Sequence, residues 1–403
     1  MSAVRPYSGA RILLGVTGGI ASYKAAWLAR LLTKAGALVD VVMTPAATEF
    51  VGAITFEALT GRAVHTGLFD PGRALDHIKL ARDASAIVVA PATADFVARA
   101  AAGQADDLLT ACLLAASGPV LLVPAMNDHM WAHAQTQRNI AHVRTLGYRV
   151  IDPVDGMLAA GEGSGPGRMP EPEAIFAHVG RLLEPAAALA GKHVLVTAGP
   201  TREAIDPVRF ISNHSTGKMG VALAAAAWRR GADVDLVAGP MSVEAPAGVN
   251  VHVVESTDEM AAAVKRLLPE SDVLVMAAAP ADFRPAQRAR SKIRKSKELT
   301  VSLESTPDIL IATAPARRRG AVIVGFALET DDAIASGRTK LASKNLDMIV
   351  VNDATEAGAG FGVDTNRVTL LRRDADDEHL PLMPKTEVAE AILDRVETLI
   401  GRR

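Results

Sequence analysis

The stretch that decides the fold reads RILLGVTGGIASYKAAWLARLLTKAGALVDVVM, residues 11–43. Its apolar runs at residues 11–16 and 38–43 have the length of strands. Residues 20–35 between them suit a helix, which the glycine at position 36 would end. A strand, a helix and a second strand in this order predict a β-α-β unit with parallel strands.

The same alternation continues through the rest of the first half. We expect strands at residues 86–90, 120–123 and 149–151 and helices over residues 94–114 and 130–146. Continuous apolar strands separated by helices are typical of a parallel sheet that is covered on both faces.

The alternation stops at residues 184–191, which read EPAAALAG and form the best linker in the chain. Beyond it the pattern starts again, with strands predicted at residues 193–197, 234–238, 273–277 and 322–326 and a helix at residues 220–230. We therefore predict an α/β protein with two Rossmann-like domains in tandem, residues 1–185 and residues 186–403.

Composition agrees with two folded domains and excludes several classes of protein. The 403 residues are 49% hydrophobic, and 43 basic against 45 acidic residues leave a net charge of −2, which excludes nucleic-acid binding by bulk charge. The single cysteine, Cys112, excludes intramolecular disulfides, multi-cysteine zinc sites and iron–sulfur clusters, and it fits a reducing cytoplasm. The apolar run at residues 108–126 is interrupted by Ser117, Gly118 and Pro119, so no membrane-spanning helix is expected there.

A glycine turn connects the first predicted strand to its helix. Gly18 and Gly19 in this turn leave two interpretations open, a phosphate held by unpaired helix N–H groups or a tight turn that needs glycine. Hydroxyl groups at Thr17, Ser22 and Thr44 favour the phosphate of a mononucleotide. The dinucleotide fingerprint G-x-G-x-x-G is missing from both halves, which argues against an NAD-dependent dehydrogenase.

Two polar residues of the first half fall where parallel sheets bind ligands. His77 begins a predicted helix and Asn127 follows a predicted strand, which would let the two meet at the carboxyl edge of one sheet, although a lone histidine at a helix start is more often a satisfied surface residue. His129 and His133 have the spacing of one helical turn, but a third ligand is missing, and a solvated or packed pair is the favoured interpretation.

Five motifs, taken together and in order, resemble the flavin-dependent cysteine decarboxylases. They are GVTGGIASYK (15–24), DHIKL (76–80), APATAD (90–95), PAMN (124–127) and GPGRM (165–169). The resemblance implies a trimeric, flavodoxin-like domain that binds FMN and decarboxylates 4'-phosphopantothenoylcysteine. A flavin suits this reaction because an unactivated carboxylate needs an electron acceptor before CO2 can leave, and a flavin supplies one.

The same resemblance implies roles for individual residues. His77 would be the catalytic base or the group that faces the substrate carboxylate, and Asn127 would orient that carboxylate. Ser22, Thr44 and Thr93 would be neighbours of the flavin.

One segment departs from the family pattern. Many relatives carry a cysteine in a flap just before G-x-G-R-M, whereas residues 158–164 here read LAAGEGS around Ala160. Glu162 or Ser164 are the candidates to donate the final proton, because Cys112 lies in an apolar stretch and reads as a buried packing residue. Two alternatives therefore stay open for this half, a flavoprotein that stops at the enethiol and a non-catalytic protein with a regulatory or assembly role.

The second half has its own polar loop and a basic segment. Residues 206–220 place amide, hydroxyl and cationic donors before a predicted helix, which suits an anion, although a long capping loop is the alternative. Residues 284–297 contain seven basic residues and no acidic one, which is typical of a mobile solvated loop or a nucleic-acid patch. Because no aromatic residues are interleaved and the chain is slightly acidic, a cationic loop that closes over a nucleoside triphosphate is the favoured interpretation. Lys292 in this segment is the candidate to offset charge in a transition state.

Six motifs of the second half resemble phosphopantothenate-cysteine ligase. They are SNHSTGKMG (212–220), AAPADFR (278–284), KIRK (292–295), PDIL (307–310), GFALET (325–330) and KNLD (344–347). The resemblance implies that CTP and Mg2+ activate the carboxylate of 4'-phosphopantothenate as an acyl cytidylate, which the amine of cysteine then attacks.

This second resemblance also assigns residues. Asn213 would hold the acyl intermediate, Lys292 would stabilise the phosphates during transfer, and Asp282 would take the cytidine. The rest of the CTP site would be lined by Met276, Ala277, Ala278, Pro307, Asp308, Ile309, Leu310, Phe326, Lys340 and Lys344. The ligands of Mg2+ are not assigned.

With both halves combined, the chain resembles the bacterial bifunctional enzymes of coenzyme A biosynthesis. The resemblance implies a decarboxylase domain followed by a ligase domain, trimeric and dimeric respectively, which together permit a dodecamer. It implies small-molecule substrates in the cytoplasm, with neither nucleic acid nor membrane as a partner.

Overall fold

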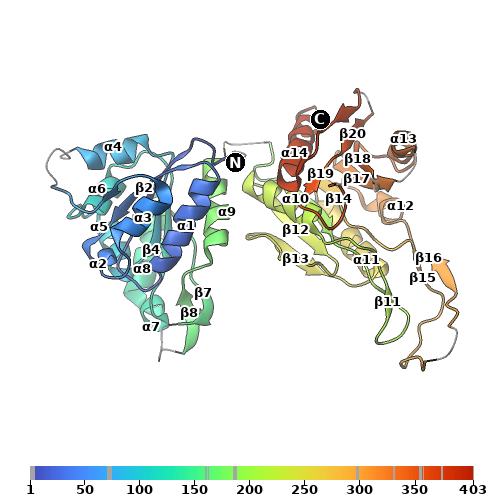
Figure 1. The fold of residues 1–403 in the computed structure, drawn as a ribbon, viewed down its shortest axis with the longest axis horizontal. Helices are drawn as coiled ribbons and strands as arrows, with labels where there is room; N and C mark the ends of the chain where they lie inside the picture. Colours follow the sequence, from blue (N-terminus) through green and yellow to red (C-terminus); the bar gives the residue numbers. More distant parts are fainter. Residues whose placement is uncertain are drawn as a thin grey trace. The chain divides into compact units, whose positions relative to one another are not determined.

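The computed structural model describes residues 5–69, 75–158, 161, 163–184, 188–295, 299–329, 332–353, 356, 358–373 and 375–402. The chain divides into two compact units, Met1–Glu184 and Pro185–Arg403 (Figure 1). Each unit has its own sheet with helices packed on it, so the predicted α/β class is confirmed.

A parallel sheet forms the centre of the N-terminal unit. Its described strands are β1 (Arg11–Val16), β2 (Leu38–Met43), β3 (Val64–His65), β4 (Ala86–Ala92), β5 (Val120–Pro124) and β6 (Arg149–Val150). They lie side by side in the order β3-β2-β1-β4-β5-β6. When the two-residue edge strand β3 is set aside, the second strand lies beside the first and the later strands follow in sequence, which is the flavodoxin-type order.

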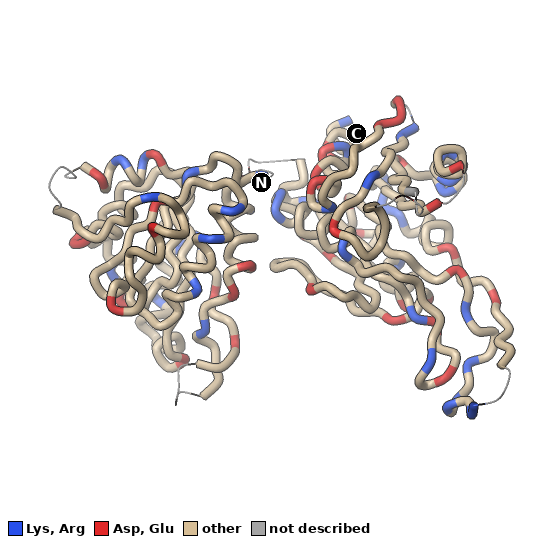
Figure 2. The backbone as a smooth tube through the Cα atoms, in the orientation of Figure 1, with Lys and Arg blue, Asp and Glu red and all other residues tan. Residues whose placement is uncertain are grey.

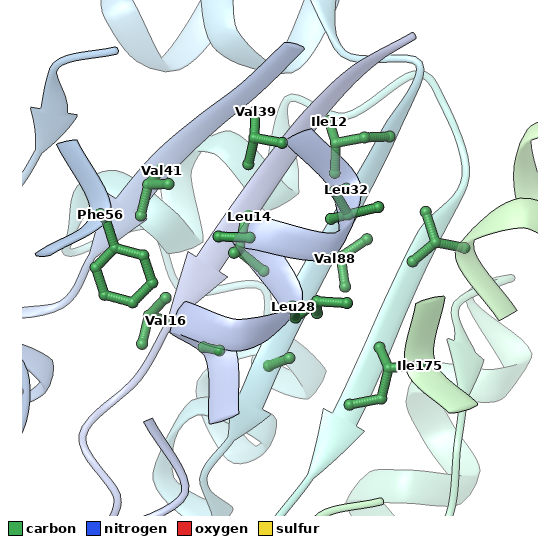
Figure 3. Close-up of a cluster of buried hydrophobic side chains, with 14 of the residues drawn as sticks. Ile12, Leu14, Val16, Leu28, Leu32, Val39, Val41, Phe56, Val88 and Ile175 are labelled. Atoms are coloured by element: carbon green, nitrogen blue, oxygen red, sulfur yellow. The ribbon is translucent and has the colours of Figure 1, made fainter. Parts of the chain in front are cut away.

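Helices cover both faces of this sheet because its strands are apolar on both sides. One buried cluster joins the sheet to α1 (Ser22–Lys34), α3 (Ala53–Thr60) and α9 (Pro172–Leu183), and the other joins it to α4 (Asp76–Asp83), α5 (Ala94–Ala102), α6 (Leu108–Leu114) and α8 (Ala134–Thr145). Figure 3 shows the first cluster, in which Leu14 and Val16 of β1 meet Leu28 and Leu32 of α1. Successive side chains of one strand thus pack into the two buried clusters on opposite faces of the sheet.

The single helix expected over residues 94–114 is wrong. Gly103 has a φ of +67° and ends α5 in the left-handed conformation that glycine adopts without strain. Asp107 then begins α6 with a capping box, in which its carboxylate accepts a hydrogen bond from the backbone N–H of Thr110 at 2.8 Å. The local stop and start signals therefore override the continuous apolar pattern.

The helix expected over residues 130–146 is also divided. The structure has α7 (Asp128–Ala132) and α8, with the extended residue His133 between them. The Nδ1 atom of His133 accepts a hydrogen bond from the N–H of Gln135 at 3.1 Å and so caps α8. His129 and His133 therefore do not share one helix, and the described residues contain no cluster of metal-binding side chains.

A histidine in α9 makes the N-terminal unit sensitive to acid. Burial, together with the charges of Arg181 and Arg149, lowers the pKa of His178 from 6.5 to about 4. Between these values the unfolded chain binds a proton that the folded chain does not, so stability must fall as the pH drops from 6.5 toward 4. From pH 7 to pH 5 we expect a loss of about 2 kcal/mol.

Denaturant unfolding of the protein and of His178→Gln at both pH values measures this effect. The variant should lose less stability on acidification than the parent chain does. An equal loss in both proteins would show that His178 is not the group responsible.

The C-terminal unit contains a larger mixed sheet. Its described strands, in spatial order, are β13 (Asn250–Val253), β12 (Asp233–Ala238), β9 (His193–Ala198), β14 (Val273–Met276), β17 (Val322–Glu329), β18 (Met348–Asp353), β20 (Thr369–Arg372) and β21 (Glu378–His379). The strands from β13 to β18 are parallel; at one edge β20 runs antiparallel to β18, and β21 runs antiparallel to β20. When the six parallel strands are numbered along the chain, their spatial order is 3-2-1-4-5-6, which is the order of Rossmann-type sheets.

Helices and two short ribbons complete this unit. The helices α11 (Thr257–Leu267), α12 (Ile309–Ala312) and α13 (Ala333–Ser343) share one buried cluster with the sheet, while α10 (Lys218–Arg229) packs on β9 and against α14 (Lys385–Gly401). One ribbon pairs β10 (Glu203–Ala204) with β11 (Phe210–Ile211), and the other pairs β15 (Phe283–Pro285) with β16 (Leu303–Ser305). Both extend away from the sheet (Figure 1).

A buried arginine holds α10 against α14. The side chain of Arg230 is only 4% exposed, and its guanidinium lies 2.6 Å from Glu390, 2.7 Å from Asp394 and 3.2 Å from Glu397. Removing the arginine leaves three carboxylates, 21–37% exposed, with one cation fewer, although Arg229 still pairs with Glu390. We therefore expect Arg230→Ala to lower the free energy of unfolding by about 3 kcal/mol, the lower end of the range for a broken buried pair.

A matched control exists in the same unit. Arg318 pairs with Asp272 at 2.8 Å, but half of the arginine side chain is exposed, and Arg318→Ala should cost less than about 1 kcal/mol. Guanidinium denaturation of both variants measures the difference. Equal losses would contradict a structural role for the Arg230 network.

Within the described ranges, no helix combines the length and the apolar character needed to cross a membrane.

Candidate active sites

The N-terminal unit has a cavity of about 900 Å3 at the carboxyl ends of its strands. It lies where the strand order reverses between β1 and β4, because residues that follow each of these strands line it. Five residues predicted for this site are in its lining: Gly18, Gly19, Thr44, Thr93 and Asn127.

The floor of this cavity is built by the turns after β1 and β4. The hydroxyl of Thr17 donates to the carbonyl of Pro91 at 2.8 Å and accepts from the N–H of Thr93 at 3.1 Å, which ties the two turns together. A Cβ atom at Gly18 would lie only 2.4 Å from the Cβ of Ala46, so the close approach of these segments requires glycine.

The predicted hydroxyl residues have different positions around the cavity. The Oγ1 atom of Thr44 is buried in the lining without a hydrogen-bond partner among the described residues. Ser22 does not line the cavity, because its hydroxyl turns back to the carbonyls of Gly19 at 2.6 Å and Thr17 at 3.0 Å. Thr93 caps α5 by accepting from the N–H of Phe96 at 3.3 Å.

Asn127 and a ribbon cover the other side of the cavity. The Oδ1 atom of Asn127 accepts from the N–H of His129 at 2.9 Å and caps α7, so its NH2 group is the part that can donate to a ligand. The strands β7 (Val154–Met157) and β8 (Ser164–Arg168) form the ribbon, and Met157 lines the cavity from it. A Cβ at Gly167 would lie 2.2 Å from the carbonyl oxygen of Met126, so this glycine lets the ribbon approach closely.

His77, which was expected to meet Asn127 at this edge of the sheet, is not among the residues that line the cavity of its own chain. It is in the first turn of α4, and its buried Nδ1 atom has no partner among the described residues. Large apolar side chains are exposed close to it in the sequence: Phe69 is 89%, Leu75 62% and Ile78 44% exposed.

The candidate proton donors of the flap are only partly described. Ser164 is exposed at the start of β8, whereas Glu162 and Ala160 lie outside the described residues. Cys112 is fully buried in α6, and burial raises the pKa of its thiol to about 12. Its prediction as a packing residue is confirmed.

Three basic residues in the lining of this cavity were not predicted. Lys24 donates to the carbonyl of Met169 at 2.8 Å, and Arg168 pairs with Glu171 at 2.5 Å. Arg99 contacts Asp95, Asp106 and Asp107 at 2.6–3.1 Å. Burial alone would lower the pKa of Arg99, but these carboxylates raise it. Lys24 and Arg168 belong to two of the quoted motifs and could have been predicted, whereas no local pattern marks Arg99.

The C-terminal unit has a second cavity, of about 480 Å3, lined by residues at the carboxyl ends of β14, β17 and β18. Of these strands, β14 lies beside β9 at the reversal point of the second sheet. Most residues predicted for the CTP site line it, namely Asn213, Met276, Ala277, Ala278, Asp282, Pro307, Asp308, Ile309, Leu310, Phe326, Lys340 and Lys344.

The N-terminus of α10 opens into this second cavity. Gly217 precedes the helix with a φ of +82°, and a Cβ at Gly220 would lie 2.4 Å from the Cβ of Ala198, so both positions favour glycine. Asn213 is fixed at both ends: its NH2 donates to the carbonyl of Ala279, and its Oδ1 accepts from the N–H of Ser215 at 3.1 Å. Helix N–H groups and a fixed amide together suit an anionic ligand.

The predicted lysines of the second cavity are held in ion pairs. Lys340 lies 2.5 Å from Glu329, and Lys344 lies 2.7 Å from Asp308. An anionic ligand would therefore have to share or replace these carboxylates as partners of the lysines.

The C-terminal part of the chain adds residues that were not predicted. Lys385 lines the cavity and donates to the carbonyls of Gly360 at 2.7 Å, Phe361 at 3.2 Å and Val363 at 2.6 Å. Burial and the charge of nearby Lys218 lower the pKa of Lys385 to about 8. Because no local pattern distinguishes a lysine at the start of the last helix, this contact needed the tertiary structure.

Lys292 is the one predicted ligase residue outside the described lining. Its side chain is exposed in the basic segment, which Figure 2 shows as a series of blue positions on the extended part of this unit. The last residues of that segment, 296–297, are outside the described ranges.

Comparison with known proteins gives a consistent result for both units. Residues 2–184 match the family model described as Flavoprotein, and residues 189–399 match the model described as DNA/pantothenate metabolism flavoprotein C-terminal domain. Proteins named coenzyme A biosynthesis bifunctional protein CoaBC are similar over nearly the whole chain. The protein from Vibrio cholerae is 46% identical over 391 residues (96% of this chain, 97% of that protein), the one from Mycobacterium tuberculosis is 48% identical over 407 residues (97% of each), and the one from Bacillus subtilis is 46% identical over 394 residues (96% and 97%).

Proposed function

The chain belongs to the family of coenzyme A biosynthesis bifunctional proteins, and from this premise we propose how its two cavities divide the work. The C-terminal unit joins cysteine to 4'-phosphopantothenate with CTP. The N-terminal unit decarboxylates the product, 4'-phosphopantothenoylcysteine, to 4'-phosphopantetheine. The observation that carries this proposal is that the two groups of motif residues, scattered along the sequence, converge on two separate cavities.

The N-terminal cavity fits FMN. Its lining provides a glycine cradle at Gly18 and a buried hydroxyl at Thr44 without a protein partner among the described residues, which are features of a preformed polar ligand site. Gly18, Gly19, Thr44 and Thr93 would hold the cofactor. When bound, FMN supplies a reversible acceptor for the electrons that decarboxylation releases.

Asn127 would bind and orient the substrate. Because its Oδ1 atom caps α7, the NH2 group is presented as a donor, and a donor suits the carboxylate that leaves as CO2. The ribbon of β7 and β8 contributes Met157 and Leu158 to the cavity, and these apolar side chains would exclude water from the substrate.

We propose that His77 serves the cavity of a neighbouring copy in a trimer. It lies outside the cavity of its own chain, at a surface where large apolar side chains are exposed. The rim of the cavity is apolar too, since Ile20 is 67% and Tyr23 61% exposed. Association would bury both surfaces and bring an imidazole to a cavity whose described lining contains none.

The C-terminal cavity would bind CTP with Mg2+. The N-terminus of α10 offers N–H groups to phosphate oxygens, and Lys340 and Lys344 supply compensating charge. Asn213, whose amide is fixed at both ends, would hold the acyl cytidylate, and Lys292 would approach the phosphates from outside. Dimerisation of this unit would combine with the trimer of the other into a dodecamer, and the proteins would work in the cytoplasm.

Purified full-length protein tests the assignment. It should show oxidised-flavin bands in its visible spectrum, release pyrophosphate from CTP only when 4'-phosphopantothenate is present, and release CO2 from 4'-phosphopantothenoylcysteine. Mass measurement of the product separates complete turnover from arrest at the enethiol, because the two products differ by two hydrogen atoms. A folded protein that binds flavin and releases no CO2 would indicate the regulatory or assembly role instead.

A further inference from the structure

Asp206 is a buried carboxylate that lies outside both cavities. Its side chain is 0% exposed, and it follows β10 at the tip of the ribbon formed with β11. One oxygen, Oδ1, accepts from the N–H groups of Val208 at 2.7 Å and Arg209 at 2.8 Å. These two bonds close the turn between the strands.

The second oxygen contacts a distant part of the chain. Oδ2 accepts from the N–H of Ile293 at 3.1 Å, a residue 87 positions away in the basic segment. The guanidinium of Arg209 supports the same link, since it lies 3.6 Å from Oδ2 and donates to the carbonyl of Ile293 at 3.3 Å. A further bond, from the N–H of Ala289 to the carbonyl of Ile205 at 2.9 Å, attaches the start of this segment.

Position 206 is an aspartate, and an asparagine there would lack the second acceptor oxygen. An asparagine would close the turn equally well, because a turn needs one acceptor oxygen. A carboxylate offers two acceptors, and among the described residues the second one contacts Ile293 and Arg209. Although burial disfavours the charged form, the three backbone N–H groups and the charge of Arg209 lower the pKa of Asp206, so it remains an acceptor at neutral pH.

The held backbone adjoins the proposed catalytic lysine. Ile293 is half-buried and fixed, while Lys292 before it and Arg294 after it are exposed. Fixing the backbone restricts the volume that the ammonium group of Lys292 can sample, and so raises the fraction of time spent where a phosphate is bound.

We propose that Asp206 is a positioning residue for the ligase reaction, which holds the backbone beside Lys292 through its second carboxylate oxygen. The inference rests on the proposed function of Lys292. It predicts that losing this single link slows transfer without weakening the nucleotide site, because none of the residues lining the cavity is changed.

Asp206→Asn removes the acceptor that faces Ile293 and keeps the acceptor that closes the turn. Its amide oxygen preserves the turn, while its NH2 group faces the N–H of Ile293 and cannot accept. Ile293→Pro removes the same link from the other side by deleting the donor. Asp233→Asn, at an exposed position of the same unit, is the control for a change of charge.

The full-length variants are compared by steady-state ligase kinetics and by hydrogen exchange of residues 289–295. We expect each link variant to lower kcat about tenfold to a hundredfold with little change in KM for CTP, and the double variant to lose no more than either single one. Exchange should accelerate in Asp206→Asn, and decarboxylation of supplied 4'-phosphopantothenoylcysteine should be unchanged.

Three results would overturn the proposal. Unchanged hydrogen exchange in Asp206→Asn would show that the link to Ile293 does not form. Faster exchange with a normal kcat would show that the link does not position Lys292. Additive losses of kcat in the double variant would show that the two substitutions act separately. If the unmodified protein forms no cytidylate, the proposed function itself has failed, which is distinguishable because the exchange measurement needs no turnover.

Discussion

Lys292→Gln should slow formation of the acyl cytidylate about a hundredfold to a thousandfold while the protein still binds CTP. The removed group is an ammonium ion proposed to offset negative charge as the phosphates rearrange, and the loss of one such donor typically has this magnitude. Binding should survive because Lys292 is outside the described lining of the cavity, which keeps Lys340, Lys344 and the N-terminus of α10.

Rapid-quench measurement of pyrophosphate release in a single turnover isolates this step. Arg290→Gln is the matched control, because Arg290 is exposed in the same basic segment and loses the same charge. A similar decrease in both variants would indicate a bulk electrostatic effect. Normal turnover by Lys292→Gln would refute the assigned role.

Mixing two inactive decarboxylase variants should restore activity. His77→Gln removes the imidazole, and Asn127→Ser removes the amide but keeps a side-chain oxygen that can cap α7. Each variant alone should release CO2 about a hundredfold to ten-thousandfold more slowly than the parent protein, the usual range for a lost acid–base group.

Recovery depends on which chains contribute to each site. If His77 reaches the cavity of a neighbour, random trimers assembled from equal amounts of the two variants contain intact sites at about a quarter of all positions. Co-refolded mixtures assayed for CO2 release measure this fraction. Mixing His77→Gln with His77→Ala is the control and should restore nothing.

Absence of recovery in the first mixture would show that both residues act within one chain. That result would contradict the inference drawn from the position of His77 outside its own cavity.

Local sequence was sufficient for the nine predicted apolar strands and for the turns after them, but it did not identify β13, β18 or β20 of the second sheet. Runs such as residues 11–16 and 193–197 are apolar on both sides and of strand length, so they are recognised without knowledge of their neighbours. The two helix predictions failed for a local reason as well: Gly103 and His133 interrupt apolar patterns that continue across them. At these two positions the helix stop and cap signals outweigh the apolar periodicity.

The candidate sites were predictable where a motif follows a strand. Met276 ends β14 and Ala277 follows it, so both must lie at the carboxyl edge of the sheet, and there they line the second cavity. Ser22 shows the limit of such reasoning, because its backbone position is near the cavity while its hydroxyl turns back to the carbonyl of Gly19. Side-chain direction depends on the competing acceptors in the folded chain.

The sequence by itself determined the class of the fold, the division into two units and the motif that follows each strand, because apolar periodicity and the conformational freedom of glycine act over a few residues. Only the tertiary structure decided that Lys385 joins the second cavity, that His77 is absent from the first, and that Asp206 holds the backbone of Ile293. These contacts join residues far apart in the chain. Their geometry is set by strand order and packing, which no local pattern encodes.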